Sequence, residues 1–100
     1  MPDSRPIPDA ALKDPDAVEM LRVWIANQGL HCSMKVGMYV EQGVDEERAW
    51  GIMLSDVIKH VSRALSREYS HPEDEAGRKI LRYLIEEFGE PTSEAAGKFV

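Results

Sequence analysis

Asp56 and His60 have the residue types and the spacing that best suit chemistry. They stand four positions apart in a stretch with helical periodicity, so both side chains would project from one side of a helix. A carboxylate one turn from an imidazole can orient the ring for proton transfer. The spacing places no serine or cysteine nucleophile beside them, and a boundary histidine that hydrogen-bonds to a neighbouring acid has the same pattern. We favour that structural interpretation.

The other side chains that ligate metals do not form a metal-binding pattern. His31 and Cys32 are adjacent, so in a strand they would point to opposite faces, and the sequence lacks HxxxH, CxxC and HExxH spacings. Cys32 is the only cysteine, and we expect it to pack as a small hydrophobic residue. Glycine-rich phosphate loops and GxSxG elbows are also lacking. We therefore predict neither a metal centre nor a cofactor.

A site of a different kind is predicted on one face of a β-hairpin. A lone hairpin has one uncovered face and two open edges, and dimerisation through the face or an edge would cover them. The alternative is that the N-terminal segment or a later helix covers this face within one chain. We expect the core side of the first strand to carry Leu21, Val23 and Ile25. The residues of the uncovered interaction face would be Arg22, Trp24, His31 and Tyr39.

A long amphipathic helix is predicted at about 45–69, and it would be the scaffold of the domain. Its apolar residues occupy an arc of about 160° on a helical wheel. Asp45 suits the N-cap position, and the polar side of the helix, which includes Ser62 and Ser66, is expected to face water. The apolar arc consists of Trp50, Met53, Leu54, Val57, Ile58, Val61, Ala64 and Leu65.

The remaining patterns complete an α+β domain. One helical turn over 15–19 precedes the first strand at about 20–26, although residues 17–26 also fit a helical template. A second strand at about 30–40 alternates apolar and polar residues, and a second helix at about 71–88 follows a capping-box spacing. We predict that the two helices pack on the hairpin. The domain would span 14–89, between a flexible N-terminal tail at 1–13 and a polar C-terminal tail at 90–100.

The composition is that of an ordinary globular chain. It has 100 residues, of which 43% are hydrophobic and 30% charged, and its net charge is -6. This acidic balance argues against proteins that coat nucleic acid or an anionic membrane. The N-terminus lacks the pattern of a secretion signal, and no apolar run approaches the roughly 18 residues needed to span a membrane. With one cysteine, the chain suits a reducing compartment, so we predict a cytoplasmic protein.

The order of these segments resembles a family of small uncharacterised bacterial proteins. That family has an RVWxA hairpin, here at 22–26, followed by a WGxxLxDxxxH-like helix. The resemblance covers most of 20–92. It implies the same domain organisation and no activity. The helix motif corresponds here to Trp50, Gly51, Leu54, Asp56 and His60.

Two functional hypotheses follow from these observations. The first is a non-catalytic interaction or assembly module, expected to be a homodimer formed through the exposed sheet face or edge. The second is a small enzyme or ligand-binding domain centred on Asp56 and His60. We favour the first, because no sequence motif supports catalysis.

Overall fold

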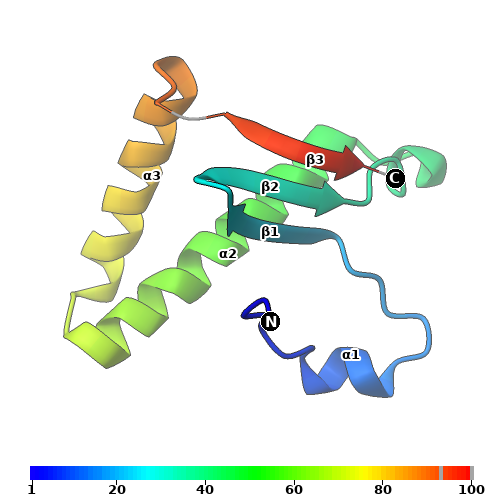
Figure 1. The fold of residues 1–100 in the computed structure, drawn as a ribbon, viewed down its shortest axis with the longest axis horizontal. Coiled ribbons are helices and arrows are strands. Elements are labelled where there is room, and N and C mark those ends of the chain that lie inside the picture. The colour runs from blue at the N-terminus through cyan, green and yellow to red at the C-terminus, as the bar shows by residue number, and fades with distance from the viewer. Residues whose placement is uncertain (93, 100) are drawn as a thin grey trace.

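A small β-sheet and a pair of helices make up most of the computed structural model, which describes residues 1–92 and 94–99 (Figure 1). The α+β class, the β-hairpin and the two predicted helices are confirmed. None of the helices among the described residues is long and apolar enough to cross a membrane. In chain order the elements are α1 (Asp9–Lys13), β1 (Leu21–Ala26), β2 (Gly29–Met34), the 3-10 helix η1 (Val40–Gln42), α2 (Glu46–Tyr69), α3 (Glu73–Gly89) and β3 (Ala95–Phe99).

The hairpin of β1 and β2 is antiparallel, and its register places the alternating residues of the two strands on common faces. Asn27 and Gln28 form its turn, and both have positive φ angles, 50° and 61°, as tight hairpin turns commonly do. Cross-strand partners lie on the same side of a sheet, so Trp24 and its partner His31 share one face. The other face, which we call the apolar sheet face, is formed by the pairs Leu21 with Met34, Val23 with Cys32, and Ile25 with Leu30.

Two predicted elements near the hairpin differ in the structure. The second strand ends at Met34 instead of residue 40, because the chain then bends into a loop that ends in η1. The helical turn expected at 15–19 is absent, and a short helix, α1, lies instead within the segment predicted to be a tail. Both errors arise because short alternating or helical patterns fit several local structures until distant contacts select one.

The C-terminal segment also departs from the predicted polar tail. β3 pairs parallel with β2, so the sheet has the order β1-β2-β3. Gly97 lies opposite Cys32 with a φ of 139°, and a Cβ at this position would overlap the Cys32 backbone, so the close approach requires glycine. The prediction also included Ser93 and Val100, which lie outside the described residues.

The two long helices begin and end where the sequence signals them. The Asp45 carboxylate accepts hydrogen bonds from the backbone N–H groups of Glu47 and Arg48, at 3.1 and 3.3 Å, which confirms it as the N-cap of α2. Ser70 ends α2 in a left-handed conformation, and α3 begins directly after Pro72. The two helices therefore form a hairpin with a very short connection.

Small residues form the contact between α2 and α3. Ser62 is 1% exposed and Ala76 is 6% exposed, and a Cβ added at Gly77 would lie 3.2 Å from the Ser62 Oγ. The Ser62 hydroxyl donates to the Ile58 carbonyl at 2.8 Å, so its burial leaves no polar atom unpaired. The expectation that Ser62 and Ser66 face water is wrong: Ser66 is half-buried beside this contact. Small side chains allow two helix backbones to approach closely, and hydropathy alone does not reveal this.

The contact of Gly77 with Ser62 predicts that substitutions at these positions are coupled. We expect Gly77→Ala to lower the free energy of unfolding by about 0.5–1 kcal/mol in the wild-type chain, because the new methyl group crowds the hydroxyl. In a Ser62→Ala background the same change should raise it by about 0.5–1 kcal/mol, because alanine favours helix over glycine. Chemical denaturation of the four chains of this double-mutant cycle measures the coupling. An equal effect of Gly77→Ala in both backgrounds would contradict the assigned contact.

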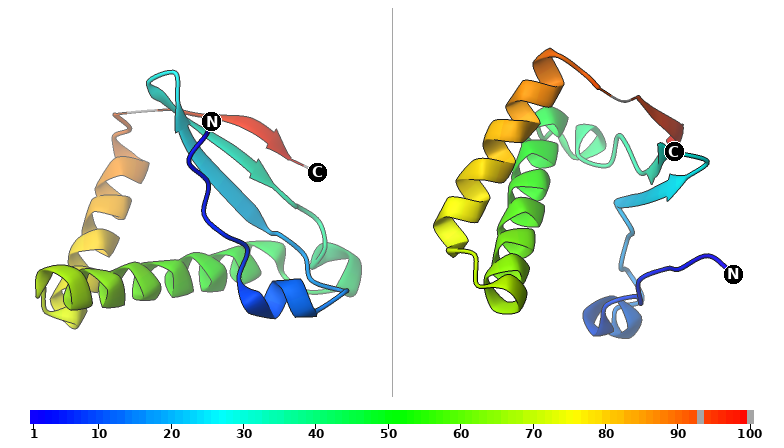
Figure 2. Two further views of the ribbon diagram at one scale, coloured as in Figure 1. Left: turned by 60° about the horizontal axis from the view of Figure 1, so that its bottom comes forward. Right: turned by 60° about the vertical axis from the view of Figure 1, so that its left-hand side comes forward.

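The sheet and the helical hairpin do not cover each other within one chain. The extensive contacts between described elements join β1 to β2, β2 to β3, and α2 to α3, but none of them joins a helix to the sheet. Figure 2 shows the sheet and the two helices as separate parts, joined by the segment 35–45 before α2 and again where the chain passes from α3 to β3. Val23 is 49% exposed and Ile25 84% exposed. The predicted packing of the helices on the hairpin is therefore not formed inside a single chain.

Candidate functional site

Four of the eight residues of the apolar arc of α2, which was predicted to face a core, are instead exposed. A stripe of five residues at alternating spacings of four and three runs along it, a spacing that keeps side chains on one side of a helix. Three of them, Leu54, Val57 and Val61, are 41%, 51% and 43% exposed. We call this stripe the helix seam, and its members are Trp50, Leu54, Val57, Val61 and Ala64.

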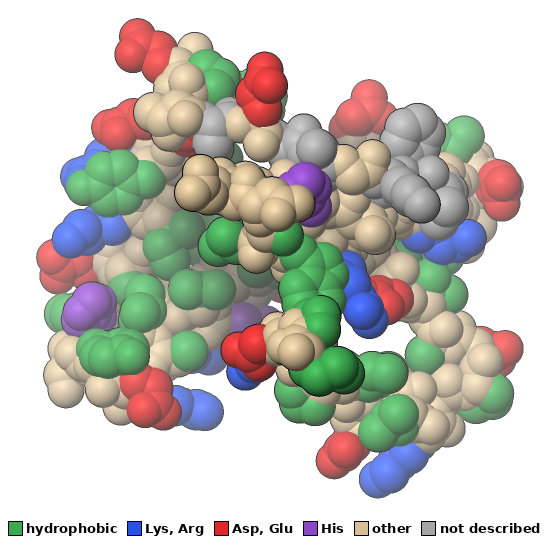
Figure 3. Space-filling view, viewed as in Figure 1, with side chains coloured by type: hydrophobic (Ala, Val, Ile, Leu, Met, Phe, Trp, Pro, Cys, Tyr) green, Lys and Arg blue, Asp and Glu red, His purple; other side chains and the backbone are tan. Residues whose placement is uncertain are grey.

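Further apolar side chains extend the exposed surface beyond the helix seam. On α3, Ile85 is 62% exposed and Phe88 is 88% exposed. Figure 3 shows hydrophobic side chains over both the helical part and the strand part of one side of the molecule. Exposed apolar surface of this extent is uncommon on a monomer and marks interaction sites.

The total accessible surface area is larger than that of a compact monomer of the same mass. The accessible surface is 8731 Å², whereas a compact monomer of 11.3 kDa exposes about 5,700 Å². The radius of gyration, 15.4 Å, also exceeds the value of about 13 Å for a compact domain of 100 residues. Ala76 is the only buried hydrophobic residue among those whose burial the structure describes. The chain thus carries about 3,000 Å² of surface that a compact fold of its size would have covered.

A buried carboxylate fixes the connection between the sheet and α2. Glu46, 8% exposed, accepts hydrogen bonds from the backbone N–H groups of Gly37, Tyr39 and Val40 at 3.1, 3.0 and 3.1 Å. Its carboxylate also accepts from the indole N–H of Trp50 at 2.9 Å. Glu46 lies in the first turn of α2, where the helix dipole favours a carboxylate. An acid one turn before a tryptophan was the available signal, but its backbone partners depend on the loop fold.

These hydrogen bonds also decide the protonation of Glu46. Desolvation by burial raises the pKa of its carboxyl, but the bonds from Gly37, Trp50, Val40 and Tyr39 together outweigh that effect. The pKa of Glu46 is therefore lowered from its ordinary value of 4.5. The ionised carboxylate of Glu46 is therefore the form that accepts the hydrogen bonds from the loop before α2.

Asp56 and His60 are both exposed on α2. Among the described residues no hydrogen bond or ion pair joins them, and neither lines the cavity beside β1 or the shallow one on α3. The hypothesis of a catalytic or ligand-binding site here stays a prediction.

The four residues of the predicted interaction face separate into two places. Trp24 is half-buried opposite His31, whose Nε2 lies 3.2 Å from the Ala26 carbonyl oxygen. Arg22 donates two hydrogen bonds to Glu19, at 2.7 and 3.1 Å, which lower the pKa of that exposed carboxyl. Tyr39 lies on the loop before α2 instead of on a strand, because β2 ends five residues earlier. Tyr39 is therefore not part of the predicted interaction face of the hairpin.

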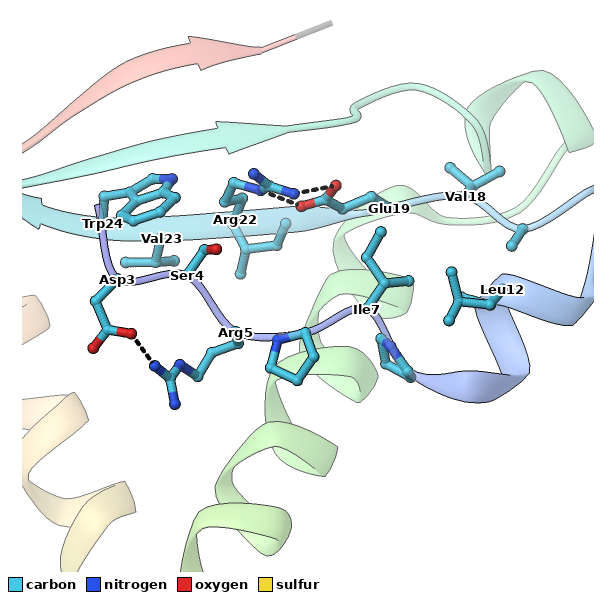
Figure 4. Close-up of a pocket in the computed structure, with 15 residues that line it drawn as sticks. Asp3, Ser4, Arg5, Ile7, Leu12, Val18, Glu19, Arg22, Val23 and Trp24 are labelled. Atoms are coloured by element: carbon cyan, nitrogen blue, oxygen red, sulfur yellow. Dashed lines mark hydrogen bonds and ion pairs between the residues drawn. The ribbon is translucent and has the colours of Figure 1, made fainter. Parts of the chain in front are cut away.

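The N-terminal segment lies beside β1 and partly covers Trp24 within the same chain. Together they enclose an open cavity of about 740 Å³, with Ile7 and Leu12 on one side and Val23 and Trp24 on the other (Figure 4). The lining includes Leu21 and Val23 of the apolar sheet face as well as Arg22 and Trp24 of the other face, so the N-terminal segment lies along the β1 edge of the sheet and covers neither face fully. The apolar sheet face, which was expected to be covered by the helices, stays partly exposed, with Ile25 84% exposed.

Metal-ligating side chains do not converge in the part of the chain that the structure describes. Within residues 1–92 and 94–99 no group of three histidine, cysteine, aspartate or glutamate side chains is placed to hold one metal ion. Cys32 is a free, half-buried thiol on the apolar sheet face.

Comparison with known proteins gives a family and a related structure. The model of a family described as domain of unknown function (DUF5076) matches residues 4–92. A solved structure from the photosynthetic bacterium Rhodopseudomonas palustrus CGA009, provisionally named as a pyruvate dehydrogenase, is similar to this chain with a TM-score of 0.70 and 28% sequence identity. The similarity covers 96% of this chain and 93% of that one. No curated protein matches the chain.

Proposed function

The chain belongs to the DUF5076 family of unknown function, and from its geometry we propose that it is a non-catalytic assembly module that works as a homodimer. The observation that carries the proposal is the excess of accessible surface, 8731 Å² against about 5,700 Å² for a compact monomer of this mass. Two chains that each cover about 3,000 Å² would bury about 6,000 Å², an area in the range of the largest obligate homodimers.

A second copy of the chain is the occupant that fits these surfaces best. The helix seam and the apolar sheet face are on the same chain, so a two-fold axis presents each of them twice and produces a closed assembly. A small chain with little buried apolar surface also gains most of its stability from such a partner. Each chain has a net charge of -6, but the exposed faces are apolar. Dimerisation through them therefore need not bring the acidic side chains of the two copies together.

The proposed role is to bring two copies together. Any additional partner would then meet a dimeric surface.

Light scattering coupled to size-exclusion chromatography tests the proposal. We expect a mass of two chains of 11.3 kDa each. The midpoint of thermal unfolding should also rise with protein concentration, because dimerisation and folding are linked. A mass of one chain at micromolar concentrations, with a cooperative transition independent of concentration, would contradict the homodimer.

A further inference from the structure

We propose that the dimer is intertwined, with the apolar sheet face of each chain packed on the helix seam of the other. The inference rests on the proposed homodimer and specifies which surfaces meet. It assigns the hairpin and α2 the contact that the sequence predicts for them, but between two chains instead of within one.

The first argument is that the apolar sheet face and the helix seam each lack a covering layer, and each can supply the layer that the other lacks. A sheet with one apolar face and a helix with one apolar stripe form a stable layer when they pack together. Within one chain the sheet and α2 make no extensive contact, and Ile25 and Val57 remain 84% and 51% exposed. Pairing two helix seams would leave the apolar sheet face open, and pairing two sheets would leave the helix seam open. Exchange between two chains covers both faces with one symmetric contact that occurs twice.

The second argument is the ordered connection between the two parts. The segment 35–45 joins β2 to α2, in addition to the later link from α3 to β3, and it contains η1 and two glycines with positive φ, Gly37 at 105° and Gly43 at 74°. Glu46 accepts hydrogen bonds from three backbone N–H groups of this segment. The connection is therefore ordered and rigid, unlike a flexible loop. It keeps the sheet away from the α2 helix of its own chain. Short constrained connections of this kind favour exchange of elements between subunits.

Crosslinking between two distinguishable chains tests the arrangement. Both chains carry Cys32→Ala to remove the native thiol. The tagged chain also carries Val23→Cys, at the centre of β1. The untagged chain also carries Val57→Cys, at the centre of the helix seam. The two are unfolded together in urea, refolded, and treated with a short bis-maleimide. We expect a covalent heterodimer at least about ten times more abundant than with Ser33→Cys in place of Val23→Cys, because Ser33 lies on the opposite face of the sheet.

Each outcome separates this inference from the homodimer itself. Equal crosslinking of the Val57→Cys chain to itself would show that two helix seams meet and would overturn the exchange, as would self-crosslinking of the Val23→Cys chain. A dimer by light scattering with no crosslink in any mixture would also overturn the exchange but leave the homodimer intact. A mass of one chain for the uncrosslinked protein would remove both proposals.

Discussion

Val57→Asp is expected to abolish the dimer and, with it, most of the cooperative fold. Val57 lies at the centre of the helix seam and is 51% exposed in the single chain, so a charge there is tolerated by the monomer and not by a buried interface. An unpaired buried carboxylate costs several kcal/mol, so dimerisation should weaken by at least about 100-fold, with two such charges in each dimer. Sedimentation equilibrium and circular dichroism at equal concentration measure the two consequences.

Ser55→Asp is the matched control for this substitution. It adds the same charge to α2 two positions away, but Ser55 is exposed and lies outside the helix seam. The control should keep the mass and the thermal midpoint of the wild-type protein. If Val57→Asp behaved like the control, the helix seam would not be part of an interface, and the excess apolar surface would need another occupant.

Glu46→Gln is expected to lower the thermal midpoint at neutral pH by roughly 5–10 °C, because buried hydrogen-bond donors would lose their acceptor. Each carboxylate oxygen accepts from two groups, Oε1 from Tyr39 and Val40 and Oε2 from Gly37 and Trp50. An amide would place an N–H₂ group against one of these pairs of donors. Trp50 fluorescence should report the same change, since its indole N–H is one of the four. Glu47→Gln, the same change on an exposed neighbouring residue, should shift the midpoint by no more than about 2 °C.

Glu46 also predicts how stability depends on pH. Its pKa in the folded chain is lowered from 4.5, so its contribution to stability is fully present above the unfolded value and is lost as pH falls through the folded one. The wild-type chain should therefore lose stability below about pH 4.5, and Glu46→Gln should lose less over the same interval. Other carboxyl groups titrate there too, so the comparison is made with Glu47→Gln at one protein concentration. Equal acid sensitivity of the two variants would contradict the role assigned to Glu46.

Local signals were sufficient to predict most of the secondary structure. Asp45 as an N-cap predicts the start of α2, and the apolar alternation on both sides of Asn27 and Gln28 predicts a hairpin. The register, which pairs Val23 with Cys32, comes from the structure. These features depend on a few neighbouring residues, so a single sequence contains them. Membership of a family of unknown function adds the domain and no chemistry.

The apolar positions on α2 and on the hairpin can be read from the sequence, because a period of 3.6 or 2 follows from backbone geometry. The surroundings of those residues depend on long-range contacts. Ser62 is buried because the small residues Ala76 and Gly77 lie opposite it, and β3 joins the sheet through a long-range parallel pairing. Four hydrogen bonds to Glu46 fix the connection between sheet and helix, so the apolar surfaces that the sequence assigns to one core remain apart within the chain.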